Sequence, residues 1–469
     1  MVFSSLIFLF AYLPLTLLAY YVVPRRWRNI VLFVLSLVFY GWGEPVYIIL
    51  MVLSITTAYL FGFLIEKYRD SDPRRAKWAM TVSLAVNLSF LFFFKYYNFF
   101  AANLSLIPFI NIPVIEGLEL PIGISFYTFQ IMSYTIDLYR RDCTLQKNYV
   151  SFGTYVTLFP QLIAGPIVRY RDVDEQLSER RETLDDFALG VQRFCCGLAK
   201  KVLVGDMLAA GYEYYKNLAE FGDTTLGAWL TVILYTLHLY YDFSGYSDMA
   251  IGLGKMFGFH FPENFNYPYI SKSITEFWRR WHISLSTWFR EYVYIPLGGN
   301  RKGKARMYFN LAVVWLLTGF WHGANWNFVL WGGYFCVILI VEKAFLLKAL
   351  EKIPNFFRHV YAMLLVTVGF LIFSFTDAQA GLSCFKALFG IGASGFTGNV
   401  VTYHFLRLLP LILIGAVGAT PLPKKLWDRL HARFPRAAVF VPLLCAAVLI
   451  LCTAYLVDST FSPFAYTQF

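Results

Sequence analysis

The chain has 469 residues, of which 58% are hydrophobic and only 15% are charged, whereas soluble domains average about 45–50% apolar and about 25% charged residues. This composition, together with a mean hydropathy of +0.55, excludes an ordinary soluble protein and predicts an all-α, polytopic membrane protein. The net charge of +11 would also suit a nucleic-acid binder, but much of the positive charge lies in loops between apolar runs, where membrane topology explains it.

Apolar runs of roughly 18 or more residues can cross a bilayer core of about 30 Å. Full or partial runs of this kind occur at 3–23, 46–65, 78–94, 226–241, 307–320, 326–341, 360–375, 406–417 and 437–457. The segments 30–40, 121–136, 152–164 and 246–259 are shorter or contain polar residues, Gly or Pro. The last three are typical of tilted, broken or re-entrant helices that face protein or water. We expect about 11 to 13 membrane segments, several of them not simple spans.

The basic loops give an orientation. The first apolar run is followed directly by Arg25, Arg26 and Arg28, and the positive-inside rule places this loop in the cytoplasm and the N-terminus outside. The next turn, 41–45, is acidic, and the loop 66–77 carries five Lys and Arg residues. The pattern therefore alternates as expected through the first four spans. The longest charged stretch, 169–186, is too short for a soluble core, so we expect one transmembrane domain over 1–469, with a core at about 1–375 and C-terminal helices at 376–469.

The segment 273–292 shows a helical period. Its apolar stripe consists of Phe277, Trp278, Trp281, Leu285, Trp288, Phe289 and Tyr292. Glu276 and Arg280 are spaced as an i,i+4 ion pair. A Trp- and Arg-rich helix of this kind is typical of the membrane surface, so we expect the stripe to pack against the bundle and Arg279 and Arg280 to stay near the cytoplasmic interface. His282 lies beside the basic face and could point either way.

The next stretch, 307–340, places a histidine inside the membrane. Apart from Tyr and Cys, His322 is the only ionisable residue of this stretch. One unbroken helix of this length would measure about 51 Å, which exceeds the bilayer core of about 30 Å. The helix must therefore break, and Gly319, Gly323, Gly332 and Gly333 offer the places. An ionisable residue inside the membrane is a functional candidate; a hydrogen-bonded packing histidine is the alternative.

The cysteine and histidine patterns argue against metal or thiol chemistry. The seven cysteines are an odd number without a CxxC motif, and neither HxxxH nor HExxH occurs. The cysteines fit the role of small buried hydrophobes, and no metal and no permanently bound cofactor are expected. No GxSxG motif is present, which favours direct transfer over an acyl-enzyme if the chain moves an acyl group.

Two long motifs carry a family resemblance. EFWRRWHISLSTWFREYVYIPLGGNR (276–301) and GFWHGANWNFVLWGGY (319–334) resemble the signature of the membrane-bound O-acyltransferases (MBOAT). The segments 121–140, 158–170 and 241–269 are similar to the bacterial branch that O-acetylates alginate, and more distantly to the branch that D-alanylates teichoic acid. The resemblance covers residues 1 to about 375 and implies an MBOAT-type helical bundle.

The resemblance also implies a reaction. An acyl group, acetyl in the alginate branch, would pass from a cytoplasmic thioester such as acetyl-CoA through the membrane to the hydroxyl of an exported polysaccharide. The resemblance makes His322 the catalytic residue and His282 a second important one. A neutral imidazole suits the base that such a transfer needs, and burial favours that form. His282 could orient a substrate, polarise the thioester carbonyl or relay a proton.

Other residues are weaker candidates for binding substrate or donor. The predicted set is Arg279, Arg280, Asn264 and Asn325, and the basic loop 301–306 could help to receive the phosphates of a coenzyme. Membrane topology alone is the favoured explanation of the basic residues. Asn264, Asn266, Asp242 and Asp248 either line the interior or cap helices.

The implied setting is a multi-pass protein of the bacterial cytoplasmic (inner) membrane. Its partners would be the acyl thioester donor, a periplasmic or extracellular acetylation protein, the polysaccharide acceptor and membrane lipid, with no nucleic acid. Alternative functions are a polysaccharide or lipid transporter, a D-alanyl transferase, or a structural subunit of an envelope assembly. Transporters also contain broken helices and interior polar residues.

Overall fold

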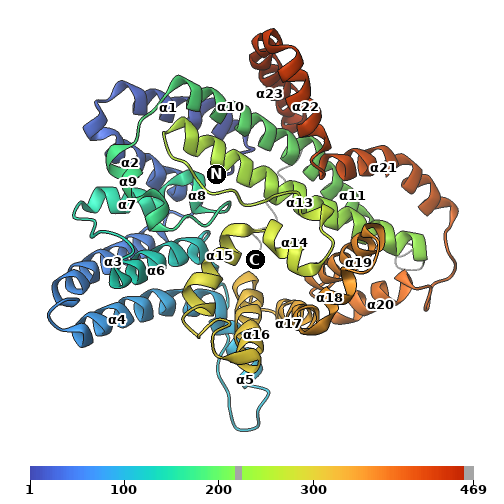
Figure 1. Ribbon diagram of the computed structural model, residues 1–469, viewed down its shortest axis with the longest axis horizontal. Helices are drawn as coiled ribbons and strands as arrows, with labels where there is room; N and C mark the ends of the chain where they lie inside the picture. Colours follow the sequence, from blue (N-terminus) through green and yellow to red (C-terminus); the bar gives the residue numbers. More distant parts are fainter. Residues whose placement is uncertain (217–223, 459–469) are drawn as a thin grey trace. The chain divides into compact units, whose positions relative to one another are not determined.

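The computed structural model describes residues 1–216 and 224–458. Over these residues the regular structure is helical, apart from one isolated bridge between Thr224 and Gly395 (Figure 1). In the same part of the chain, six helical segments are long and apolar enough to cross a membrane: 48–68, 73–104, 326–350, 355–374, 399–418 and 435–458. The predicted class, an all-α polytopic membrane protein, is confirmed. The expected total of 11 to 13 segments also includes shorter and broken ones and stays a prediction.

The helices form two compact units. The first unit contains 1–194 and 247–262, and the second contains 195–216, 224–246 and the described residues from 263 onward. The helices of the first unit are α1 (Leu13–Val22), α2 (Arg28–Gly41), α3 (Ile48–Tyr68), α4 (Pro73–Leu91), α5 (Tyr97–Leu104), α6 (Ile124–Arg140), α7 (Tyr149–Thr157), α8 (Phe159–Leu162) and α9 (Tyr170–Glu179). The chain passes between the units within α10 (Leu184–Ala199), within α13 (Thr225–Met256) and again between Pro262 and Glu263. The expectation of one domain over 1–469 stays a prediction.

The second unit holds the remaining helices. They are α11 (Asp206–Lys216), α14 (Ile274–Arg280), α15 (Ile283–Phe289), α16 (Gly303–His322), α17 (Trp326–Val341), α18 (Leu347–Leu350), α19 (Asn355–Ser374), α20 (Ala378–Leu388), α21 (Asn399–Gly418), α22 (Leu422–Arg433) and α23 (Val441–Asp458). Short π-helical segments extend several helices of the two units, namely η1 (Phe8–Tyr12), η3 (Phe92–Tyr96), η4 (Lys200–Gly205), η6 (Arg290–Tyr294) and η7 (Glu342–Leu346).

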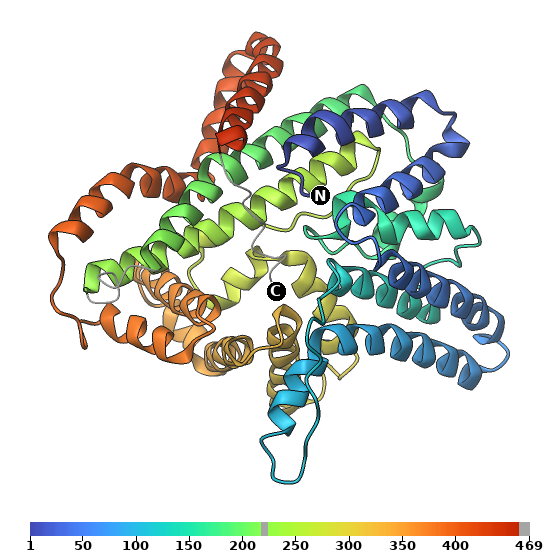
Figure 2. The ribbon, with the colours of Figure 1, turned by 180° about the vertical axis from the view of Figure 1, so that it is seen from behind.

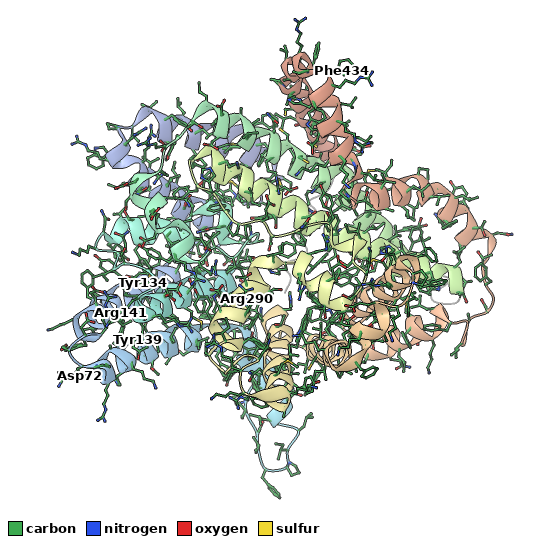
Figure 3. All side chains as sticks on the ribbon, in the orientation of Figure 1. Asp72, Tyr134, Tyr139, Arg141, Arg290 and Phe434 are labelled. Carbon is green, nitrogen blue, oxygen red and sulfur yellow. The ribbon has the colours of Figure 1, made fainter. Side chains whose placement is uncertain are left out.

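Local sequence explains the ends of several helices. Asp72 accepts hydrogen bonds from the backbone of Arg74 and Arg75, and Pro73 follows it, which is a strong start signal for α4. Arg141, directly after α6, pairs with Asp70 between α3 and α4, and Figure 3 labels Asp72 and Arg141 near these helix ends. The predicted polar loop at 66–77 is therefore a short, ion-paired turn.

Two of the irregular segments can be compared with expectation. The predicted break in 152–164 is confirmed, since α7 ends at Thr157 and α8 follows after Leu158. In 246–259 no break occurs before Met256, because α13 runs for 32 residues to that point, and a tilted helix there stays a prediction. Polar side chains within α13 are matched by partners instead: Asp242 lies 2.7 Å from Lys201, and Asp248 lies 2.6 Å from Arg193.

Buried charge occurs where helices widen into π-helical turns. Lys95 in η3, Lys201 in η4 and Glu342 in η7 are all buried. Single π-turns are frequent at functional sites. Glu342 is the one of these three that supports the candidate site described below.

Helices α16 and α17 pack side by side (Figure 2), and two glycines allow their close approach. A Cβ at Gly319 would lie 2.4 Å from the carbonyl oxygen of Phe328, and one at Gly332 would lie 2.5 Å from that of Trp315. Small residues allow this approach, as in membrane helix pairs generally. These two glycines therefore serve packing, and the break between the helices occurs at Gly323.

Candidate active site

His322 is the last residue of α16. The backbone turns extended at Gly323, and α17 begins at Trp326, so the predicted break beside His322 is confirmed. The imidazole is 4% exposed. Its ring centroid lies 5.0 Å from that of Trp321, 5.0 Å from that of Trp331 and 5.3 Å from that of Phe373, each at a steep angle. The histidine is therefore enclosed by aromatic rings.

The continuous helix predicted for 273–292 is wrong. The chain forms α14 and α15 with His282 between them in the left-handed conformation, at φ 45° and ψ 55°. The cause is a pairing with a distant segment: the amide of Asn266 donates to Arg280 O at 2.9 Å, and that of Ile283 donates to Asn264 O at 3.0 Å. A left-handed non-glycine residue costs roughly 1–2 kcal/mol, and such strain persists only where surrounding contacts enforce it.

Asn264 orients His282. Its Oδ1 lies 3.0 Å from Nδ1 of His282 and also accepts the hydroxyl of Ser284 at 2.8 Å and its amide at 3.3 Å. Because an amide oxygen only accepts hydrogen bonds, Nδ1 must carry the proton, and the lone pair of the neutral ring lies on Nε2. His282 is outside the helices long enough to span a membrane, and burial lowers its pKa, which favours this neutral form. The same oxygen thus caps α15 and sets the tautomer.

One indole lies close to both histidines. The ring of Trp321 is 5.9 Å from that of His282 and 5.0 Å from that of His322. Phe243 of α13 lies edge-on to His282, with ring centroids 4.7 Å apart. Two histidines that are far apart in the sequence therefore meet around Trp321, in surroundings made mainly of aromatic side chains.

The Trp-rich stripe packs inward even though its helix is broken. Its members Phe277, Trp278, Trp281, Leu285, Trp288, Phe289 and Tyr292 are all buried. Trp278 lies 4.7 Å from Trp315 and 4.9 Å from Phe335, measured between ring centroids. The predicted pair of Glu276 and Arg280 is confirmed at 2.9 Å. Through Trp278, the stripe packs α14 against α16 and α17.

The remaining predicted residues are exposed or have local partners. Arg279 is exposed. Arg280 is bound by Glu276 and by the carbonyl of Asn266 at 3.1 Å. Asn325 is half-buried before α17, where its carbonyl accepts the amide of Phe328. A role of these three residues in binding the donor stays a prediction.

Glu342 is a supporting residue that the sequence reasoning missed. Its carboxylate is 1% exposed and accepts the amides of Ile274 and Thr275, both at 2.7 Å, the Thr275 hydroxyl at 2.6 Å and the Tyr361 hydroxyl at 3.1 Å. It therefore holds the start of α14, the helix that leads to His282. The available signal was its position as the first acidic residue after the long apolar stretch, because buried carboxylates in membrane segments are rare.

Asn327 supports the other histidine and was also missed. Its side chain is buried and donates to Phe373 O at 3.0 Å. Phe373 in turn lies against the ring of His322. The sequence signal was a polar amide within an apolar helix, which has to find a partner when it is buried.

The arrangement suits proton transfer. A neutral imidazole has a ring nitrogen that can accept a hydrogen bond or a proton from a hydroxyl group. Within residues 1–216 and 224–458, no group of three His, Cys, Asp or Glu side chains has the arrangement of a metal site. The two histidines offer acid–base chemistry in an apolar setting.

Comparison with known proteins identifies related chains. The model of the MBOAT family, membrane-bound O-acyltransferases, matches residues 145–385. A protein of Azotobacter vinelandii named "Probable alginate O-acetylase AlgI" is 41% identical, with both chains covered completely. The peptidoglycan O-acetyltransferase of Helicobacter pylori is 34% identical over 83% of this chain and 80% of its own. The teichoic acid D-alanyltransferase of Bacillus subtilis is 32% identical over 48% of this chain and 59% of its own.

Proposed function

The chain belongs to the membrane-bound O-acyltransferase family, and we propose that it transfers an acetyl group from a thioester donor to a hydroxyl group of an exported polysaccharide such as alginate. The relatives named above as an alginate O-acetylase and a peptidoglycan O-acetyltransferase support this proposal, since both names describe acetylation of a carbohydrate polymer. The chain matches both over most of its length, whereas its match to the D-alanyltransferase covers about half.

The meeting of His322 and His282 at Trp321 carries the proposal. His322 takes the proton of the acceptor hydroxyl, the oxygen attacks the thioester carbonyl, and the thiolate that leaves receives the proton. Direct transfer of this kind needs one general base, which contributes typically about 10²–10⁴-fold. Neither histidine needs a covalent intermediate in this scheme.

Of the three roles that the sequence left open for His282, the proposal retains two. With its proton on Nδ1 and bound to Asn264, the neutral ring presents an acceptor at Nε2. It can accept a hydrogen bond from the hydroxyl substrate or relay its proton, but it cannot polarise the thioester carbonyl, which requires a donor. We therefore assign His282 to orienting the acceptor hydroxyl or relaying its proton.

The same proposal includes the setting. The donor is a cytoplasmic thioester such as acetyl-CoA, with Arg279, Arg280 and the loop 301–306 near its phosphates. The protein lies in a bacterial cytoplasmic membrane with its N-terminus outside, as the basic loops indicate. A periplasmic acetylation protein and the polysaccharide receive the acetyl group on the far side.

Substitution of His322 tests the mechanism. In membranes with matched expression, His322→Gln and His322→Ala should both lose labelled acetate transfer by about 10²-fold or more, because Gln can hydrogen-bond but takes up no proton near neutral pH. The exposed His431 provides the control, and His431→Gln should keep full activity. Near-normal turnover of His322→Gln would remove His322 from the mechanism.

The choice of acyl group and the alternative functions need a separate assay. Purified protein is given labelled acetyl-CoA or a labelled D-alanyl thioester together with a periplasmic acceptor. Transfer of acetate supports the proposal, and transfer of D-alanine alone assigns the chain to the D-alanyl branch. Movement of polysaccharide or lipid across vesicles without any acyl transfer would indicate a transporter.

A further inference from the structure

A basic cavity of about 620 Å³ lies in the first unit. It is lined by the loop between α1 and α2, the start of α7 and the end of α9. Its charged residues are Arg25, Arg26, Arg28, Glu179, Arg180, Arg181 and Glu182. Five arginines face two glutamates, so the cavity, here called the basic pocket, has an excess of three positive charges.

Two of these arginines build the wall. Arg28 lies 2.7 Å from Glu182, and Arg180 donates to Tyr20 Oη at 2.9 Å and to Asn29 Oδ1 at 2.7 Å. Burial raises the pKa of Glu182, but hydrogen bonds from Tyr20 and Arg28 bring it below its ordinary value, so this carboxylate stays ionised and keeps both arginines in place. The wall is therefore ordered by its own side chains.

The other three arginines remain at the surface. The side chain of Arg25 is 70% exposed and only 4.0 Å from Glu182 at its nearest approach, while Arg26 and Arg181 are exposed. Arginine binds phosphate through two parallel hydrogen bonds. Three such side chains at the rim of one cavity offer a site for a ligand with more than one phosphate.

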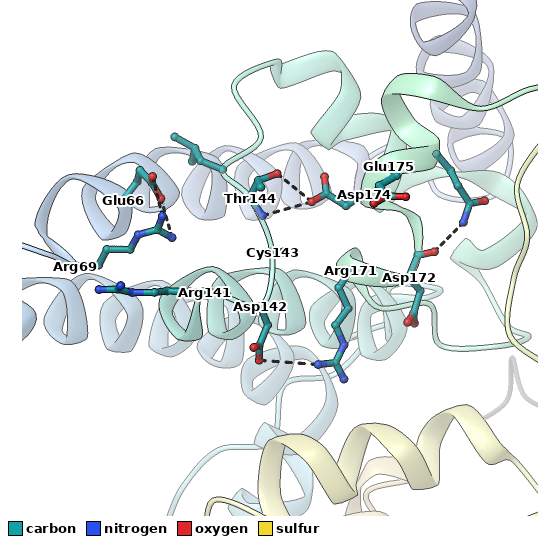
Figure 4. Close-up of a pocket in the computed structure, with 12 residues that line it drawn as sticks. Glu66, Arg69, Arg141, Asp142, Cys143, Thr144, Arg171, Asp172, Asp174 and Glu175 are labelled. Carbon is teal, nitrogen blue, oxygen red and sulfur yellow. Dashed lines mark hydrogen bonds and ion pairs between the residues drawn. The ribbon is translucent and has the colours of Figure 1, made fainter.

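A neighbouring cavity shows that this charge is local. The cavity in Figure 4, of about 500 Å³, is lined by three arginines and by the five carboxylates of Glu66, Asp142, Asp172, Asp174 and Glu175. Its Arg69 lies 3.0 Å from Glu66, and its Arg171 lies 3.9 Å from Asp142. Topology alone would favour basic residues in both places, yet of these two cavities only the basic pocket has a positive excess.

Apolar surface runs away from the basic pocket along both adjoining helices. On α1, Leu15, Leu18 and Val22 are 65%, 63% and 73% exposed, and on α2, Ile30, Val34 and Val38 are 36%, 50% and 51% exposed. The spacing of three to four residues puts each set on one helix face. Trp27, in the loop between the helices, is 47% exposed, as is typical at a membrane interface.

We propose that the basic pocket binds the headgroup of an acidic phospholipid that carries two phosphates, while its acyl chains lie along the exposed faces of α1 and α2. Basic pockets at the ends of membrane helices bind such headgroups. The apolar faces favour a lipid over a soluble phosphate compound, and the three rim arginines favour two phosphates over one. This site is independent of the proposed acyl transfer.

The test measures binding of fluorescent cardiolipin, which has two phosphates, to the purified full-length protein in detergent. The variant R25Q/R26Q/R181Q removes the rim and leaves Arg28 and Arg180 intact. Each basic residue near an anionic lipid contributes a factor of about five, so the affinity should fall roughly 100-fold. Binding should also weaken as salt rises.

The matched control removes the same charge elsewhere. Lys67, Arg74 and Lys77 are exposed residues of the loop between α3 and α4 and its flanks, and K67Q/R74Q/K77Q should bind cardiolipin as the natural protein does. Equal thermal unfolding temperatures of the two triple variants show that both are folded. If both variants lost binding equally, the loss would depend on the net charge of the protein and not on the basic pocket, which would overturn the proposal.

Competition separates lipid from soluble phosphate. Unlabelled cardiolipin should displace the probe at low concentration, phosphatidylglycerol should need a higher concentration, and phosphatidylethanolamine should not displace it. Pyrophosphate should compete only at far higher concentration, because it has no acyl chains. Displacement by pyrophosphate as effective as that by cardiolipin would make this a soluble-phosphate site and overturn the proposal, as would the absence of cardiolipin binding.

Discussion

Removal of the Asn264 side chain should leave the proton of the His282 ring free to occupy either nitrogen. In Asn264→Ala, three donors lose their acceptor: Nδ1 of His282, and the hydroxyl and the amide of Ser284. Asn264, His282 and Ser284 are all buried. Each buried donor left without a partner costs about 1–3 kcal/mol. Because the smaller side chain leaves room for water, we expect a total near the low end, about 3 kcal/mol of unfolding free energy.

The activity should fall by more than the stability explains. Without the amide oxygen, the His282 ring can place its proton on either nitrogen and can rotate, so we expect acetate transfer to drop by roughly 10–100-fold, within the range for a group assisting proton transfer. The assay is initial-rate transfer from labelled donor in expression-matched membranes, at a temperature where the variant is fully folded. Thermal unfolding in detergent measures the stability separately.

The conservative variant Asn264→Asp keeps the hydrogen-bond acceptor for His282 but adds a negative charge beside the ring. A carboxylate keeps the acceptor and should restore folding, but its negative charge stabilises the imidazolium form of His282. The pKa of His282 would then rise, the ring would stay protonated up to a higher pH, and the acid limb of the pH–rate profile should move to higher pH. This direction follows from a mechanism that requires the neutral ring.

A second buried asparagine provides the control. Asn310 is fully buried and donates to Gly299 O at 3.1 Å, and it lies about 18 Å along α16 from His322. Asn310→Ala should lose stability but keep the natural pH profile. The role assigned to Asn264 fails if Asn264→Ala is less stable yet turns over normally, or if Asn264→Asp leaves the acid limb unmoved.

Two further substitutions test the supports of the site. Glu342→Gln places an amide NH2 group against the donors of Ile274 or Thr275, so it should lower the unfolding free energy by about 2–3 kcal/mol and reduce transfer. The exposed Glu351→Gln should do neither, and an unchanged melting temperature for Glu342→Gln would contradict the assignment. Gly319→Ala puts a Cβ 2.4 Å from Phe328 O and should cost about 1–3 kcal/mol by overpacking. Gly333→Ala has open space and should be neutral or slightly stabilising, so equal melting temperatures for the two glycine variants would refute the close approach of α16 and α17.

The sequence alone determined the features that depend on composition, length and helical period. The low charge content required a membrane protein, and the length of the apolar stretch around His322 required a break that the structure places at Gly323. The inward-facing stripe and the pair of Glu276 with Arg280 follow from a spacing of three or four residues. These features are local, so neighbouring residues suffice to specify them.

Only the tertiary structure decided how the site is held. The break at His282 comes from pairing with Asn264 and Asn266, and the capping carboxylate of α14 comes from the distant Glu342. The contact of His282 with Trp321, the neighbour of His322, is likewise a long-range contact. A periodic pattern predicts the face on which a residue lies, but not the distant backbone that it meets. Those long-range contacts override the local preference for one continuous helix, because a buried amide, carboxylate or imidazole has to be satisfied by whichever segment packs against it.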